Sequence, residues 1–186
     1  EVYIRRAYTR RIYEERSTFY TRQVMHSPAA PLQELSVFTG DGSTLLHEMA
    51  RQAFGNTVRV LRQSLMQHAQ NRSLSEETRC NIVKSVRVAV LRQERFNGRS
   101  PLHLAIVLHG PQSKVFIELF QMVKDFFHDD LPKTISPRCK LNRRTVDEVL
   151  SEVHDRFGHS VSYYVATNDH SLQHSEVTRE RSQYAV

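Results

Sequence analysis

A long apolar run is the first thing that this sequence lacks. No stretch approaches the roughly 18 consecutive apolar residues that suggest a membrane-spanning helix, and the first residues contain no apolar core of a signal peptide. With 39% hydrophobic and 25% charged residues, the composition is that of an ordinary soluble protein. We therefore predict a soluble chain without membrane association. Because it begins at Glu1 rather than at methionine, we expect it to be a piece of a longer protein.

Cysteine is also scarce. Cys80 and Cys139 are 59 residues apart, and neither belongs to a C-x-x-C pattern. This spacing argues against a disulfide framework and against a zinc site. We predict two ordinary thiols and an intracellular protein of the nucleus, the cytoplasm or both.

Short catalytic motifs are missing as well. The sequence contains no G-x-S-x-G, P-loop, G-x-G-x-x-G or H-E-x-x-H pattern. His170 and His174 have the spacing of one helical face, but no third metal ligand matches them, and we attribute the adjacent acids Asp129 and Asp130 to solvation. We predict a protein that is not an enzyme and that uses no cofactor or metal.

The chain divides into three parts. Residues 1–30 form a basic, aromatic segment that ends in a proline-containing break, residues 31–168 form the main domain, and residues 169–186 form a polar tail that we expect to be loosely docked. We predict a helix up to about Arg16. Its apolar stripe comprises Ile4, Tyr8 and Ile12.

Two segments of the main domain resemble each other. Residues 42–50 read GSTLLHEMA and residues 98–106 read GRSPLHLAI, while residues 158–166, GHSVSYYVA, keep the glycine and the hydroxyl but not the Leu-His pair. The glycine suits a turn with positive φ, and the Ser or Thr hydroxyl suits a helix N-cap. Pro101 suits the first helical turn, and the histidine has two nitrogens that can bond neighbouring backbone groups. Each segment is therefore predicted to be a turn followed by a helix.

Four further helices are expected between and after these segments. The spacing of apolar residues predicts helices over 57–70, 75–93, 113–127 and 145–157. Ser73 with Glu76 and Thr145 with Glu148 have the spacing of capping boxes. Residues 128–142 contain two prolines and are predicted to be an irregular excursion.

The first two segments resemble ankyrin repeats, whose signature T-P-L-H-x-A opens the first helix of a helix pair. The residues that carry the motif are Gly42, Thr44, Leu46, His47, Gly98, Ser100, Pro101, Leu102, His103 and Ala105. Asp41-Gly42 before Ser43 also resembles the opening of the first repeat in the inhibitor-of-NF-kappa-B group. The resemblance implies an all-α fold that binds a protein partner, with a Rel-type transcription factor as the partner if the narrower likeness holds.

The spacing departs from this family. Ankyrin repeats have about 33 residues, whereas Gly42 and Gly98 are 56 residues apart and Gly98 and Gly158 are 60 apart. Each interval holds either an inserted helix, which we favour, or a degenerate repeat. We thus expect a short ankyrin-type helical stack with inserted or degenerate helices and a helical N-terminal cap.

The resemblance also implies which residues contact a partner. They lie on the first helix of each repeat and at the turn tips: Glu48, Arg51, Gln52, Arg95, Asn97, Arg99, Leu104, Val107 and Leu108. Two alternatives stay open. One is a general adaptor that recruits a substrate or signalling protein. The other is nucleic-acid binding through arginines that alternate with tyrosines in residues 1–13.

Overall fold

The described part of the molecule is helical. The computed structural model describes Leu35, Gly40, residues 42–128, Leu131, Ile135 and residues 144–167. In these ranges there are seven helices and no β-strand, and one isolated antiparallel bridge joins His154 to Ser160. The fold class is therefore all-α, as expected. The predicted N-terminal helix, the Asp129-Asp130 pair, most of the excursion and the His170-His174 pair lie outside the described residues.

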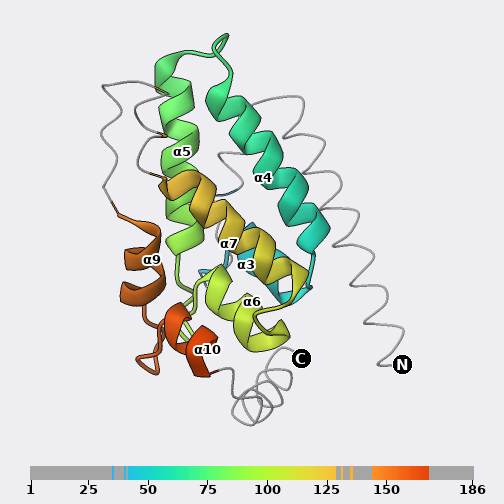
Figure 1. Cartoon of the computed structure of the whole chain (residues 1–186), viewed down its shortest axis with the longest axis vertical. Coiled ribbons are helices and arrows are strands. Elements are labelled where there is room, and N and C mark those ends of the chain that lie inside the picture. Colours follow the sequence, from blue (N-terminus) through green and yellow to red (C-terminus); the bar gives the residue numbers. More distant parts are fainter. Residues whose placement is uncertain are drawn as a thin grey trace.

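The first half of the described chain is a short helix followed by two long ones. They are α3 (Leu45–Arg51), α4 (Gly55–Gln70) and α5 (Glu76–Leu91). Helices α4 and α5 form a long hairpin whose connecting end projects beyond the other helices (Figure 1). The interval between Gly42 and Gly98 thus contains three helices, α3, α4 and α5. That one of them is an insertion into a repeat stays a prediction.

The second half repeats the order of a short and a long helix. It contains α6 (Pro101–His109), α7 (Lys114–Phe127), α9 (Val146–Glu152) and α10 (Val161–Thr167). Most of helix α10 lies within the weakest of the three similar segments, residues 158–166, so that segment also forms a helix after its glycine.

The helices form two layers. The short helices α3, α6 and α10 pack in this order, and the long helices α4 and α7 pack against each other (Figure 1). Helix α4 also packs against α3, and α7 against α6. Gly55, the first residue of α4, allows a close approach at the start of α7, where a Cβ atom would lie 2.8 Å from the carbonyl carbon of Lys114. Helix α5 packs against α4 and α7, and α9 packs against α7 and α10.

The apolar stripes of the long helices fill the space between these layers. On α5 the predicted stripe is buried throughout, with Ile82, Val83, Val86, Ala89 and Val90 each at most 2% exposed. Helix α7 contributes seven buried side chains, three of them phenylalanines: Val115, Phe116, Leu119, Met122, Val123, Phe126 and Phe127. One continuous core therefore joins both halves of the described chain.

One predicted capping box and one predicted helix end are wrong. Helix α5 is capped by Ser75, whose hydroxyl accepts a hydrogen bond from the Thr78 N–H at 3.1 Å, while the Ser73 hydroxyl donates to Asn71. The predicted box of Ser73 and Glu76 does not form, because the chain between α4 and α5 turns for two more residues. The box of Thr145 and Glu148 is present at the start of α9.

Helix α9 ends five residues before the predicted end at Phe157. After Glu152 the chain enters a turn whose residues Asp155 and His159 are joined by a backbone hydrogen bond of 2.9 Å. The apolar period of this segment continues into the turn, so periodicity alone placed the helix end too late. Of its predicted inward residues only Val149 is buried; Val146, Leu150 and Val153 are half-buried.

The prediction for the cysteines is also wrong. Cys80 is buried on α5 and is disulfide-bonded. Cys139 is the other cysteine of the chain and lies outside the described residues. Because disulfides are rare in the reducing cytosol and nucleus, the cysteines do not favour an intracellular compartment.

Candidate functional site

Three turns precede the short helices and lie at one end of the layers. We call residues 42–44 the first turn, residues 93–100 the second turn and residues 154–160 the third turn. Their glycines have positive φ: Gly42 at 81°, Gly98 at 63° and Gly158 at 80°. At Gly98 a Cβ atom would also lie 3.0 Å from the Arg156 nitrogen, so the second turn can approach the third only with glycine there.

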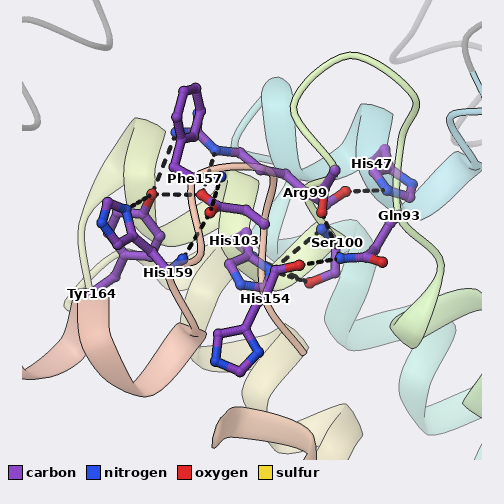
Figure 2. Close-up of polar contacts among 11 residues, drawn as sticks. His47, Gln93, Arg99, Ser100, His103, His154, Phe157, His159 and Tyr164 are labelled. Atoms are coloured by element: carbon purple, nitrogen blue, oxygen red, sulfur yellow. Dashed lines mark hydrogen bonds and ion pairs between the residues drawn. The ribbon is translucent and has the colours of Figure 1, made fainter. Parts of the chain in front are cut away.

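Backbone and side-chain bonds hold neighbouring turns together. The Arg156 N–H donates to the Asn97 carbonyl oxygen at 2.7 Å. The Gln93 amide donates both to the Gly98 carbonyl oxygen, at 2.7 Å, and to that of His154 (Figure 2). These bonds place the second and third turns side by side.

His47 joins the first turn to the second. Its Nδ1 lies 3.0 Å from the Thr44 nitrogen and 2.8 Å from the Thr44 hydroxyl oxygen. A backbone N–H can only donate, so Nδ1 is an acceptor and the ring proton is on Nε2, which donates to the Arg99 carbonyl oxygen at 3.1 Å. The fully buried His47 side chain thus hydrogen-bonds the N-cap residue of its own helix and also the backbone of the next turn.

His103 has the same local role in the second unit. Its Nδ1 lies 2.8 Å from the Ser100 hydroxyl oxygen and accepts the Ser100 N–H at 3.3 Å. Its buried Nε2 makes no hydrogen bond of normal geometry with the described residues. Burial lowers the pKa of His103 from 6.5 to about 4, although the Asp155 carboxylate and the nearby backbone of His159 act in the opposite direction. The side chain is therefore neutral at pH 7.

A buried polar network lies between the second and third turns. The Asp155 carboxylate accepts hydrogen bonds from the Tyr164 hydroxyl at 2.7 Å, from the Arg99 guanidinium at 3.5 Å and from the backbone N–H groups of Phe157 and His159 at 2.9 and 3.0 Å. Figure 2 shows Arg99, His159 and Tyr164 gathered around this point. Four donors therefore satisfy one inward-facing carboxylate.

The ionisation of this network follows from its contacts. Burial alone raises the pKa of Asp155, but the hydrogen bonds from Tyr164 and the His159 backbone, together with the Arg99 charge, outweigh it and leave the pKa below its usual value. Burial and the bond to Asp155 raise the pKa of Tyr164. At neutral pH the network thus contains a carboxylate, a guanidinium and a neutral phenol.

A corresponding acid lies between the first and second turns. Glu94 is 2% exposed and forms an ion pair with Arg51 from the end of α3. The Arg51 guanidinium also pairs with Glu48 and donates to the Ser43 hydroxyl at 2.8 Å. The second and third turns therefore each contain, as their second residue, an acid that faces inward and is neutralised by an arginine.

The predicted contact residues of α3 are only partly available to a partner. Glu48, Arg51 and Gln52 are half-buried. Arg51 is committed to its partners within the chain, so its role in the structure is internal.

Three predicted contact residues are buried, and their assignment as exposed residues is wrong. Arg99 is 1% exposed because its side chain turns inward toward Asp155. Leu104 and Val107 are at most 1% exposed because α3, α7 and α10 surround α6. Leu108, one residue further along α6, is half-buried.

The second and third turns expose both predicted residues and residues that sequence reasoning missed. Arg95 is exposed, as predicted, whereas Asn97 is half-buried. Phe96 is 60% exposed and Phe157 is 54% exposed, and the neighbour of Phe157, Arg156, is also exposed. A signal was present in the sequence, because residues 94–98 read ERFNG and residues 155–158 read DRFG.

The described ranges contain neither a cluster of metal-binding side chains nor a helix that could span a membrane. No group of three or more His, Cys, Asp or Glu side chains there is arranged to hold a metal ion. None of the described helices has the length and apolar character that crossing a bilayer requires.

Comparisons with known proteins give no family for this chain. No protein-family model matches it, and no curated protein sequence matches it.

Proposed function

We propose that this chain is a non-catalytic protein-binding module of the ankyrin-repeat type, which presents its turn tips to a partner. The proposal is supported by the order turn, short helix, long helix, and by the two histidines that close their own helix starts. It is further supported by the hydrogen bond from His47 to the Arg99 carbonyl oxygen, which joins two successive units at a motif position.

One observation carries the proposal. Glu94 and Asp155 are buried in ion pairs beneath the turns, while Phe96 and Phe157 project from the same turns into solvent. Exposed aromatic side chains on a rigid scaffold are the usual anchors of protein interfaces. A surface of this kind binds with little loss of conformational entropy.

We further propose that the chain regulates transcription or signalling by binding a protein of that pathway. If the resemblance to the inhibitor-of-NF-kappa-B group holds, that protein is a Rel-type transcription factor. A general adaptor that recruits a substrate or signalling protein would use the same surface.

Site-directed photocrosslinking tests the proposal. The photoreactive amino acid p-benzoylphenylalanine replaces Phe96 in the full chain, and the same substitution at Val88, which is 58% exposed on α5, is the matched control. We expect irradiation in cell extract to crosslink discrete proteins from position 96 and not from position 88. Equal crosslinking from both positions, or crosslinking to nucleic acid alone, would contradict the proposal.

A further inference from the structure

The second and third turns separate their charges between the inside and the outside. Each contains one carboxylate, Glu94 or Asp155, and these are 2% and 6% exposed. The arginines that follow them, Arg95 and Arg156, are exposed. A sequence that alternates acid and base therefore presents only base at the turn surface.

The two Arg-Phe pairs lie next to each other. Besides the backbone bond from Arg156 to Asn97, the Arg156 guanidinium donates to the Phe96 carbonyl oxygen at 3.0 Å. The Arg95 guanidinium donates to the Gly40 carbonyl oxygen at 3.2 Å. A guanidinium has five N–H donors, so one such bond orients the group without exhausting its donors.

We propose that Arg95, Phe96, Arg156 and Phe157, which we call the turn ridge, bind an acidic segment of a protein partner that also carries apolar side chains. This inference rests on the proposed function and specifies the chemistry of the partner. The arginines pair with carboxylates of the segment, and the phenylalanines bury its apolar side chains. The net charge of +6 on the chain favours approach of the same segment.

The ring environment favours a protein over a nucleic acid. Base stacking requires open ring faces, whereas the Arg99 guanidinium carbon lies 5.6 Å from the centre of the Phe157 ring. The neighbouring Tyr163 ring is stacked on His159 with 4.2 Å between ring centres. The Phe157 ring and the neighbouring Tyr163 ring are therefore each already covered on one face by another side chain, which leaves less ring surface for stacked bases.

Selection from a random library of 12-residue peptides displayed on phage tests the inference. The bait is the full chain, and enriched peptides are synthesised with a fluorescent label for anisotropy titration. We expect them to be rich in Asp and Glu with interspersed Phe, Leu or Trp. The double variant F96A/F157A and the double variant R95E/R156E should each weaken binding at least about tenfold, which corresponds to about 1.4 kcal/mol.

Two control variants match these substitutions in kind. V88A/I117A removes two exposed apolar side chains from α5 and α7, and R59E/K84E reverses two exposed charges on α4 and α5. Both should leave peptide affinity unchanged. R95E/R156E should in turn prefer peptides in which lysines replace the acidic residues, which a merely misfolded variant would not do.

Three results would overturn the inference: no enriched peptide, enriched peptides without acidic bias, or equal effects of ridge and control variants. Binding of a labelled 20-residue oligothymidine that is lost in F96A/F157A would overturn it too, in favour of single-stranded nucleic acid. If discrete proteins still crosslink from position 96 while any of these results is obtained, only the acidic-segment inference fails and the protein-binding proposal stands.

Discussion

The first junction, where the first and second turns meet, and the second junction, where the second and third turns meet, each neutralise a buried carboxylate with an arginine, but the two arginines come from different elements. At both, a turn places a carboxylate in the interior, Glu94 at the first junction and Asp155 at the second. Arg51 reaches Glu94 from the end of a helix and retains Glu48 and Ser43 as partners, whereas Arg99 belongs to the second turn itself and is almost wholly buried. The scaffold thus requires a cation for each inward acid but not a cation at one fixed position.

Replacing the buried acid should give the largest difference in unfolding free energy between the two junctions. Asp155→Ala leaves the Arg99 guanidinium buried and also removes an acceptor for two backbone N–H groups, so we expect a loss of about 3–5 kcal/mol in unfolding free energy. Glu94→Ala should cost about 1–3 kcal/mol, because Arg51 keeps two other partners.

Urea unfolding followed by circular dichroism measures both changes. Asp147→Ala, which removes an exposed acid from α9, is the control and should lie within about 0.5 kcal/mol of the parent. A smaller cost for Asp155→Ala than for Glu94→Ala would show that the second junction does not depend on its ion pair.

Acidification should weaken the second junction through His103. Its pKa is about 4 in the folded protein and 6.5 as an ordinary histidine, so its contribution is complete above pH 6.5 and is lost as pH falls toward 4. The loss is on the order of 3 kcal/mol. The lowered pKa of Asp155 acts in the same direction, but only below its ordinary value of 3.8.

Unfolding free energies measured between pH 7.5 and pH 4.5 test this dependence, with His103→Gln as the comparison. The variant should lose most of the slope between pH 6.5 and pH 4.5. An unchanged slope would assign the pH dependence to other histidines.

The two motif histidines should differ in their cost of removal. His47→Ala strands the Thr44 N–H and removes one of the two hydrogen bonds to the Arg99 carbonyl oxygen, which keeps the one from the Glu94 N–H. We therefore expect a loss of about 2 kcal/mol. His103→Ala strands only groups of Ser100 and should cost about 1 kcal/mol less when both are measured at pH 7.5. Equal costs would mean that the bond from His47 to Arg99 contributes nothing to the first junction.

The smallest expected effect concerns a hydroxyl found only at the second junction. Tyr164→Phe removes the donor that lies 2.7 Å from the Asp155 carboxylate and should cost about 1 kcal/mol. Because that bond lowers the pKa of Asp155, the variant should also begin to lose stability at a higher pH on acidification. Tyr163→Phe on the same helix is the control and should change neither quantity.

Much of the fold could be predicted from the sequence, and the candidate surface only in part. The motif residues at 42–47 and 98–103 form the predicted turns and helix starts because their contacts span three or four residues of chain. The similar segment at 158–160 forms the same turn without its Leu-His pair, since Gly158 and Ser160 suffice for the turn and the helix start. Ser75 was missed as a cap because Ser73 has capping-box spacing to Glu76, whereas in the structure the Ser73 hydroxyl donates to Asn71 and the Ser75 hydroxyl accepts from the Thr78 N–H.

Local sequence specifies the first and second turns and the helix starts that follow them, because glycine with positive φ, a capping hydroxyl and a histidine three residues later act within one helical turn. The tertiary structure alone decided which side of each turn faces solvent. Arg95 and Arg99 lie four residues apart in one turn, yet one is exposed and the other is buried because Asp155, 56 residues further along the chain, lies beside it. Leu104 and Val107 are covered for the same reason, since the neighbours that bury them come from distant helices whose positions no local pattern specifies.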